Sequence, residues 1–347
     1  MKQFHIQWHI LDRCNLRCTH CYQDNYSNSQ ELDLNSLTRI ADNLNYSMKN
    51  MHRHLNLSIT GGEPLLSDHL IELMKYIDNL SFIDQANIIT NGTLLEEKLA
   101  DLSKIKKCQK IFISLDGTCS DSNDSIRGNG VFEKVIKGIS NIDRNRFEVF
   151  LMFTLMKSNF KDAFVLDEFI KTCNLDGAII EKFVPLGNHD KNFKNVVTKI
   201  QLRELFEYYL RKYNYSADRS FEIRALMIKR NNHKDRIFPF FSGKSYYKDK
   251  MEIKKGICIA GSDGVAVMPD GSIFPCRRLP VSLGNILDGC LDKILESSFI
   301  YNNLGERSLI KGKCGICESR ECFGCRAMAY SVSKDYLASD PHCWKEI

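Results

Sequence analysis

Residues 4–21 read FHIQWHILDRCNLRCTHC, and this stretch decides how the rest of the chain is interpreted. Its first seven residues alternate and carry aromatic and branched side chains, which predicts a β-strand. Cys14, Cys18 and Cys21 follow in one loop, with three residues and then two between them. Three thiolates in a loop fit iron–sulfur or zinc chemistry, but a structural zinc site usually closes with a fourth ligand. Because no fourth ligand is evident, the spacing favours an open, chemically active cluster.

A second group of cysteines lies near the other end of the chain. The sequence has fourteen cysteines, and seven form this group: Cys258, Cys276, Cys314, Cys317, Cys322, Cys325 and Cys343. Seven thiols exceed what packing needs, and one 4Fe–4S cluster takes only four, so two metal sites are implied. A single four-thiolate zinc site is the alternative. The remaining four cysteines are expected to be small buried hydrophobic residues.

Composition and charge limit the number of domains, the binding partners and the cellular location that we expect. The 347 residues suggest roughly two domains. The net charge of +5 is too weak by itself to indicate nucleic-acid binding. We find no apolar run of membrane-spanning length and no secretory signal, so we expect a cytoplasmic protein without a membrane span. In a reducing cytosol, many cysteines indicate metal binding or catalysis more often than disulfides.

Six predicted strands alternate with five predicted helices over the first half of the chain. The strands are expected at 4–10, 55–60, 86–90, 110–115, 147–155 and 177–184, and the helices at 34–44, 69–77, 94–102, 131–142 and 162–173. This α/β alternation predicts a parallel sheet with covering helices that closes into a barrel or an incomplete barrel. The cysteine loop, GGEP (61–64), TNG (90–92) and SLDG (114–117) each follow a predicted strand. We therefore expect these four loops on one face.

The CxxxCxxC loop after the first strand, together with GGEP after the second, resembles the radical S-adenosylmethionine (SAM) enzymes over about residues 4–190. The resemblance implies a partial (βα)6 TIM-like barrel. It also implies a 4Fe–4S cluster held by Cys14, Cys18 and Cys21, whose open iron binds the amino and carboxylate groups of SAM. One electron from the cluster would then cleave the sulfonium and yield a 5′-deoxyadenosyl radical, which takes a hydrogen atom from the substrate.

The same resemblance implies that loops after the strands bind SAM. GGEP would line the methionine amino group, and the histidine between the last two cysteines would lie near the adenine. The serine and aspartate of SLDG would contact the ribose or carboxylate, and the arginine of SIRG (125–128) would pair with the carboxylate. The expected SAM-binding residues are His20, Gly61, Gly62, Glu63, Pro64, Asn91, Ser114, Asp116, Arg127, Val184 and Leu186.

The second cysteine group resembles the SPASM domain, a C-terminal extension of many radical SAM enzymes. Four residues separate Cys317 from Cys322 and two separate Cys322 from Cys325, where five and three are usual in that domain. By resemblance, Cys258, Cys276 and Cys325 would hold a first auxiliary cluster. A second would be held by Cys314, Cys317, Cys322 and Cys343. The first set needs a fourth ligand, which is either another residue or an open position that substrate could occupy. The expected cofactors are therefore SAM and three 4Fe–4S clusters.

We expect three segments: a radical SAM barrel at 1–190, a helical and basic linker at 191–250, and a small Cys-rich SPASM domain at 251–347. The basic, aromatic residues 214–250 could hold an acidic or extended leader peptide, or could be a solvated linker. No catalytic residue is assigned, because Asp116, Glu181 and His189 are candidate general bases without a supporting pattern.

SPASM-bearing enzymes mostly modify peptides or proteins, so the resemblance favours modification of a ribosomally made peptide by crosslinking, thioether formation or oxidation. An anaerobic sulfatase-maturing enzyme is one alternative, and a small-molecule enzyme of cofactor or tetrapyrrole synthesis is another. A zinc protein that binds nucleic acid would have no need for GGEP. The expected partners are a peptide or protein substrate and an electron donor of the flavodoxin or ferredoxin type.

Overall fold

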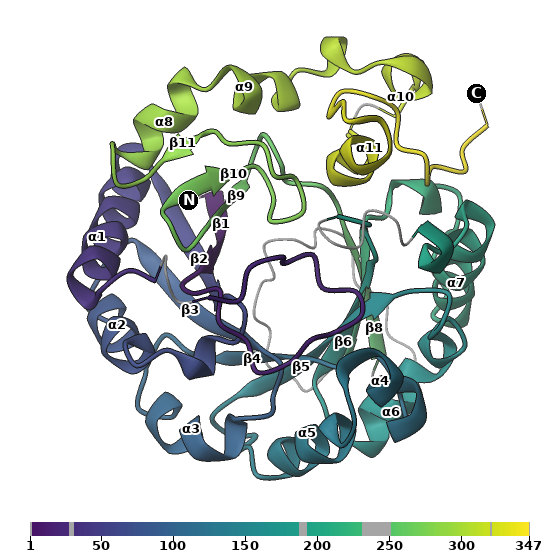
Figure 1. Ribbon diagram of the computed structural model, residues 1–347. Coiled ribbons are helices and arrows are strands. Elements are labelled where there is room, and N and C mark those ends of the chain that lie inside the picture. The colour runs from purple at the N-terminus through teal and green to yellow at the C-terminus, as the bar shows by residue number, and fades with distance from the viewer. Residues whose placement is uncertain (1, 28–30, 187–192, 231–250, 320, 347) are drawn as a thin grey trace.

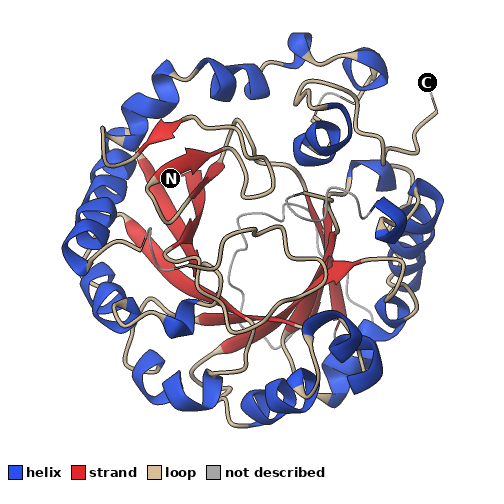
Figure 2. Cartoon of the chain, in the orientation of Figure 1, coloured by secondary structure: helices blue, strands red, loops and turns tan. Residues whose placement is uncertain are grey.

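The computed structural model describes residues 2–27, 31–186, 193–230, 251–319 and 321–346. A curved sheet lines the inside of the molecule and helices cover its outside (Figures 1 and 2). Six strands at its centre run parallel in chain order. They are β1 (Lys2–His9), β2 (Arg53–Thr60), β3 (Ile83–Thr90), β4 (Lys110–Ser114), β5 (Glu148–Leu155) and β6 (Gly177–Lys182). The partial α/β barrel predicted from the sequence is confirmed.

Seven helices accompany the strands: α1 (Leu34–Asn50), α2 (Leu70–Ile77), α3 (Leu95–Leu102), α4 (Ser120–Arg127), α5 (Val131–Ser140), α6 (Leu166–Thr172) and α7 (Lys199–Lys212). Helix α1 begins at Asp33, whose side chain accepts from the Ser36 amide, and it buries Leu37, Ile40 and Leu44 against the sheet. Helix α4 was not expected, because SDSNDSIR has almost no apolar periodicity. It forms where the chain leaves β4, and it buries Arg127 in its last turn.

The sheet continues beyond the six parallel strands on both sides. The added strands are β7 (Ala225–Arg230), β8 (Met251–Gly256), β9 (Gly264–Val267), β10 (Ser272–Phe274) and β11 (Gly284–Asn285). Strand β7 pairs antiparallel with β6, and β9 pairs parallel with β1. The described sheet therefore has the order β11-β10-β9-β1-β2-β3-β4-β5-β6-β7-β8, with β11 and β8 at its edges.

The segment expected to be a linker thus contributes α7 and β7. Strand β7 was missed because its short apolar core is flanked by charged residues. Residues 231–250, the basic and aromatic part of that segment, lie outside the described residues, as do His189 and the expected boundary near 190. Strands β8 and β9 belong to the barrel sheet, although they fall in the expected 251–347 segment. Strands β9 and β10 pair antiparallel as a hairpin.

The C-terminal part of the chain lies beside the open side of the barrel (Figure 1). It contains α8 (Leu291–Ser297), α9 (Phe299–Gly305), α10 (Gly312–Ile316) and α11 (Arg326–Ser333). Short 3-10 helices occur at Pro64–Leu66, Asp162–Val165, Phe193–Asn195, Ser220–Glu222 and Arg307–Leu309. Within the described ranges, no helix is both long enough and apolar enough to cross a bilayer.

Candidate functional site

The loop after β1 brings its three cysteines to one pocket at the carboxyl ends of the strands. Cys14, Cys18 and Cys21 all line it, and we call it the cysteine-loop pocket. The loop is held by its backbone, because the Thr19 amide donates to the carbonyl of Ile126 at 2.9 Å. The Cys21 amide donates to the Cys18 carbonyl at 3.1 Å. Helix α4, which supplies Ile126, therefore fixes the middle of the cysteine loop.

The GGEP loop after β2 packs directly beneath the cysteine loop. The Gly62 amide donates to the Leu11 carbonyl at 2.9 Å, and the Glu63 amide donates to the Arg13 carbonyl at 2.8 Å. A Cβ at Gly62 would lie 2.2 Å from the Arg13 carbonyl oxygen, a distance that van der Waals contact forbids. Only glycine lets the two loops approach this closely. Gly61 and Gly62 both line the cysteine-loop pocket.

Glu63 lies behind the pocket wall rather than in it. Its carboxylate is fully buried and accepts from the Thr90 hydroxyl and the Asn91 amide, both at 2.6 Å. It also accepts from the Leu65 amide at 3.1 Å. The glutamate therefore joins the GGEP loop to the end of β3. Burial raises the pKa of Glu63 to about 7, although these hydrogen bonds favour the charged form.

The raised pKa of Glu63 makes stability depend on pH. The stabilisation is present below an unfolded-state pKa of about 4.5 and is lost as the pH rises through about 7. We expect the unfolding free energy to fall by up to about 3 kcal/mol over this range, at about 1.4 kcal/mol per pKa unit. Glu63→Gln should flatten this dependence. Urea denaturation at pH 5 and pH 8 measures it, and an equal loss of stability in both proteins would contradict the assignment.

Asn91, at the end of β3, ties the cysteine loop to the next loop. Its amide nitrogen donates to Asn15 Oδ1 at 2.8 Å and lies 3.9 Å from Cys14 Sγ. Its oxygen accepts from the hydroxyl and backbone amide of Thr93. Asn15 in turn donates to the Thr93 hydroxyl at 2.8 Å. This closed set of hydrogen bonds orients the first cysteine. Asn91 also lines the cysteine-loop pocket, where SAM binding was expected.

Asp116 holds two expected cofactor residues in place. One carboxylate oxygen accepts from His20 Nε2 and from Arg127 Nη2, each at 2.6 Å. The other accepts from the Thr154 amide at 2.7 Å. Burial would raise the pKa of Asp116, but Arg127 and His20 lower it below its usual value. Asp116 is fully buried and does not line the pocket, so the structure gives it a positioning role.

His20 and Arg127, which Asp116 positions, do line the cysteine-loop pocket. Arg127 Nη1 lies 3.9 Å from Cys18 Sγ, and its Nε has no hydrogen-bond partner among the described residues. Ser114 and Val184 line the same pocket. Pro64 and Leu186 are buried outside it. The structure thus brings most of the expected SAM-binding residues together, and their contacts with SAM stay predictions.

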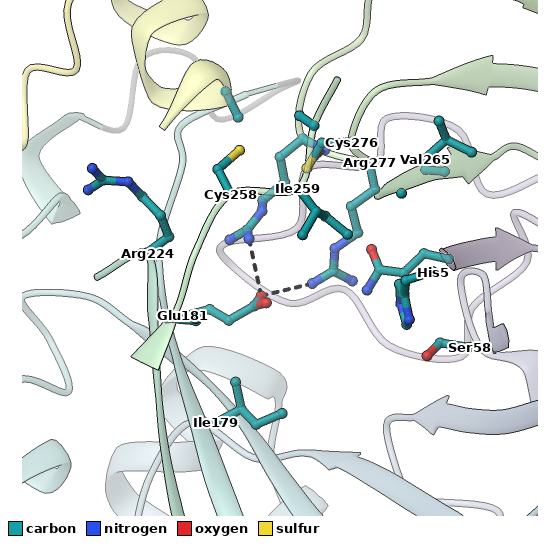
Figure 3. A pocket seen from close by; sticks show the side chains of 18 of the residues that line it. His5, Ser58, Ile179, Glu181, Arg224, Cys258, Ile259, Val265, Cys276 and Arg277 are labelled. Carbon is teal, nitrogen blue, oxygen red and sulfur yellow. Dashed lines mark hydrogen bonds and ion pairs between the residues drawn. The ribbon is translucent and has the colours of Figure 1, made fainter. Parts of the chain in front are cut away.

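The first expected auxiliary set also comes together. Cys258, Cys276 and Cys325 line a second pocket inside the barrel, which we call the barrel cavity (Figure 3). Burial, together with the neighbouring Cys325 and Cys276, raises the pKa of Cys258 to about 11. The Arg278 amide lies 3.5 Å from Cys276 Sγ. Residues 67 positions apart thus meet at one end of the cavity, as the resemblance implied.

Hydrogen bonds from Arg307 and Lys313 hold the backbone of the second auxiliary set. Arg307 donates to the carbonyls of Cys314, Cys317 and Cys322 at 3.2, 2.5 and 2.8 Å. Lys313 Nζ donates to the carbonyl of Cys343 at 2.7 Å. These bonds act on the backbone, so they leave the four thiols available as ligands. Arg307 carries no pattern in the sequence that would have predicted this role.

Asp340 lies between the two auxiliary sets at the centre of a buried charge cluster. Its Oδ2 is 3.4 Å from both Lys182 Nζ and Arg224 Nη1, and accepts from the Cys325 amide at 2.7 Å. The Asp340 amide lies 3.3 Å from Cys314 Sγ. Burial would raise the pKa of Asp340, but Lys182 and Arg224 hold it far below its usual range. Asp340 therefore connects both cysteine sets to the barrel.

The residues present fit iron–sulfur clusters. Cys14, Cys18 and Cys21 line one pocket, and Cys258, Cys276 and Cys325 line another. Cysteine thiolates are the usual ligands of such clusters.

Family comparisons agree with this geometry. The radical SAM superfamily matches residues 8–169, and the SPASM iron–sulfur cluster-binding domain matches residues 258–325. The chain carries a radical SAM domain followed by an SPASM domain. Such domains imply 4Fe–4S clusters and SAM as cofactors. Six of the seven cysteines of the second group fall inside the SPASM match, and Cys343 follows it.

Curated relatives of this radical SAM–SPASM chain are similar over nearly their whole length. The AdoMet-dependent heme synthase of Methanosarcina barkeri is 27% identical over 97% of this chain and 95% of that protein. The heme synthase of Nitratidesulfovibrio vulgaris is 26% identical over 97% and 91%. Streptococcus suis SuiB bound to SAM shares the fold, with a TM-score of 0.71 and 18% identity over 99% of this chain and 78% of SuiB. Native anSMEcpe with bound AdoMet has a TM-score of 0.67 and 20% identity, over 98% and 94%.

The structure adds site residues that the sequence did not single out for a role. Lys182, Arg277 and Arg278 line both the cysteine-loop pocket and the barrel cavity, together with Glu181, a candidate general base from the sequence. The two arginines directly follow a cysteine of the second group, which was the available signal. Their meeting with β6 needed the three-dimensional fold.

Proposed function

We propose that this radical SAM enzyme acts on a tetrapyrrole that bears carboxylate groups. The observation that carries the proposal is the barrel cavity, which lies between the cysteine-loop pocket and the first auxiliary set and has two unlike walls. One wall is apolar and the other polar, and guanidinium groups lie at its end. A porphyrin, a flat apolar ring with propionate carboxylates at its rim, matches such a cavity.

The apolar wall comes from the strands β3 to β6. Ile89, Phe112, Met152 and Ile179 project inward from consecutive strands and line the cavity. Phe112 stacks on Phe150 with ring centroids 5.7 Å apart. Such a surface favours the face of an aromatic ring, because burying apolar area contributes roughly 25 cal/mol per Å². It offers nothing to a hydrophilic substrate.

The polar wall comes from β1, β2 and β3. It presents His5, Gln7, Asn56, Ser58 and Asn87 to the cavity. Burial lowers the pKa of His5 to about 3, so this imidazole is neutral at physiological pH. Neutral amides, a hydroxyl and an imidazole can orient a substrate by hydrogen bonds without adding charge. A substrate between the walls would therefore have one defined orientation.

The residues present fit the cofactors that the two domains imply. Cys14, Cys18 and Cys21 would hold one cluster, with Arg127 and Asn91 beside it. When bound, the cluster and SAM would supply the one-electron chemistry that removes a hydrogen atom from the substrate. Asp116 and Asn91 would keep the surrounding residues in fixed positions through their hydrogen bonds and ion pairs. We propose two further clusters at the auxiliary sets, an external flavodoxin- or ferredoxin-type electron donor, and a cytoplasmic location.

Sequence similarity supports the tetrapyrrole class. The heme synthases match almost the whole chain at 26–27% identity. Another relative, the Fe-coproporphyrin III synthase of Methanosarcina barkeri, is 25% identical over 66% of this chain and 56% of that protein. SuiB and anSMEcpe are less than 25% identical and speak for the fold alone. We therefore place the tetrapyrrole ahead of the peptide that the domain pair favoured at first.

Peptide modification is the second candidate, because the sheet is open. Within the described residues, β8 pairs only with β7 and leaves an edge. An extended peptide could pair with such an edge by strand addition. Sulfatase maturation would be one form of this activity. Both stay hypotheses that the following experiment also tests.

The test is an anaerobic assay with the reconstituted, reduced holoenzyme and SAM. Iron coproporphyrin III is the first probe, and a set of cysteine- and serine-containing peptides is the second. We expect the porphyrin to raise the rate of 5′-deoxyadenosine formation above the basal rate and to change in mass, with no change in the peptides. Modification of a peptide with an unchanged porphyrin would replace the tetrapyrrole proposal with the peptide one.

A further inference from the structure

Arg277 occupies the boundary between the two pockets. It follows Cys276 in the chain, and its guanidinium reaches into the barrel cavity to Glu181 (Figure 3). Its Nη2 lies 3.2 Å from Glu181 Oε2 on β6. Its guanidinium carbon lies 5.5 Å from the centre of the Tyr22 ring, in the loop that carries the three cysteines. The side chain thus touches the cysteine loop, the barrel and the SPASM domain at once.

The charges around Arg277 do not balance. Arg278 Nη2 lies 3.4 Å from the same Glu181 oxygen, so two buried guanidinium groups share one carboxylate. Among the described residues no second carboxylate pairs with either guanidinium, and the other groups that face Arg277 are Tyr22, His9 and the thiol of Cys276. A buried charge without a counter-charge is costly. An anion is therefore expected here.

The two arginines face different neighbours. Arg278 donates to the Lys182 carbonyl at 3.1 Å, and Cys276 and Cys325 both raise its pKa. Arg277 has no backbone carbonyl partner of this kind among the described residues, and its guanidinium hydrogen-bonds to Glu181 inside the barrel cavity (Figure 3). Its remaining N–H groups can therefore take a group that enters the cavity.

We propose that Arg277 is a substrate-binding residue that takes a carboxylate of the substrate at the boundary between the barrel cavity and the cysteine-loop pocket. Guanidinium and carboxylate groups form paired, charge-assisted hydrogen bonds, which fix orientation as well as affinity. The carboxylate is bound at the border of the pocket expected to hold SAM, so the substrate carbons attached to it face SAM. This inference rests on the proposed function and names the substrate group that the site recognises.

The carboxylate of SAM is the competing anion, and the geometry argues against it. Arg127 lies beside Cys18 with its Nε unpaired, on the α4 side of the same pocket. Arg277 comes from the opposite side, between β6 and the SPASM domain. Arg127 is therefore placed for the carboxylate of SAM, and Arg277 for the carboxylate of the substrate. Separate measurements of SAM and substrate affinity distinguish the two assignments.

The experiment compares two porphyrin probes on anaerobically reconstituted holoenzyme. Coproporphyrin III carries four carboxylates, and its tetramethyl ester carries none. The variants are Arg277→Gln, Arg277→Lys and the matched surface control Arg211→Gln, whose side chain is 71% exposed. Porphyrin absorbance gives the Kd of each probe, and equilibrium dialysis gives the Kd of SAM. Iron content shows that each variant is assembled.

We expect Arg277→Gln to weaken binding of the free acid by about 10- to 100-fold, the effect of losing a hydrogen-bonded charge pair. Affinity for the ester and for SAM should stay within about twofold. Arg277→Lys should recover part of the loss. Unchanged acid affinity in Arg277→Gln, or a loss confined to SAM, overturns the inference alone. A wild-type enzyme that binds neither porphyrin overturns the proposed function and the inference with it.

Discussion

Cys18→Ala is expected to abolish reductive cleavage of SAM while leaving the C-terminal clusters in place. Cys18 lines the cysteine-loop pocket with Cys14 and Cys21, and Arg127 lies beside its sulfur. Only three protein thiolates are expected to hold this cubane, so the two that remain in the variant should not retain it. The variant should lose about four of roughly twelve irons per chain, the count for three cubanes. Cleavage of SAM should fall to the background rate, measured as 5′-deoxyadenosine after reduction.

A matched control is available in Cys119. This cysteine belongs to neither cysteine group and is exposed, so the burial expected of the four remaining cysteines is wrong for it. Its sulfur lies 3.4 Å from the Ser122 hydroxyl. Cys119→Ala should keep full iron content and normal cleavage. If Cys18→Ala cleaves SAM normally, the assignment of the active cluster is wrong. A colourless protein loaded with zinc would contradict the cluster interpretation as a whole.

Asp340→Asn is expected to have the largest effect on stability. It removes the carboxylate from Lys182 and Arg224, which are 2% and 9% exposed, so that Lys182 loses its counter-charge and Arg224 keeps the Cys322 sulfur nearby. Breaking a buried ion pair from one side typically costs about 3–5 kcal/mol. The Cys325 amide also loses a charged acceptor. Urea denaturation under anaerobic conditions measures the loss, and iron content should fall because both auxiliary sets contact this residue.

Asp335→Asn serves as the control for Asp340→Asn. Asp335 pairs with Lys311 at 2.7 Å, but their side chains are 34% and 64% exposed. Surface pairs contribute about 0–1 kcal/mol, so this variant should retain its stability and iron. Equal losses in the two variants would show that the buried cluster around Asp340 has no special role in joining the SPASM domain to the barrel.

Local sequence features predicted much of the cofactor site. Strand–loop alternation placed the cysteine loop, GGEP and TNG at one end of a parallel sheet, and the structure has them there. Asp116 shows where this reasoning stopped. The resemblance predicted that it contacts SAM, but the structure buries it behind the pocket, where it holds His20 and Arg127. Which way a side chain points after a strand depends on packing that the local pattern does not encode.

Helix α4 and strand β7 escaped prediction for a related reason. Helix α4 has a polar sequence and is stabilised by its place between the loop after β4 and the cysteine loop, where the Ile126 carbonyl accepts from the Thr19 amide. Strand β7 is short, and pairing with β6 and β8 makes it a strand. Tertiary hydrogen bonds outweigh weak local preferences in both segments.

The sequence by itself determined the two cysteine groups, the α/β alternation and the loops at the strand ends. These features depend on covalent spacing and on the local period of helices and strands. Only the tertiary structure decided which charges meet. Lys182 and Asp340 are 158 residues apart, and Glu181 and Arg277 are 96 apart. Their pairing follows from burial, because charges removed from water must find partners wherever the fold brings them.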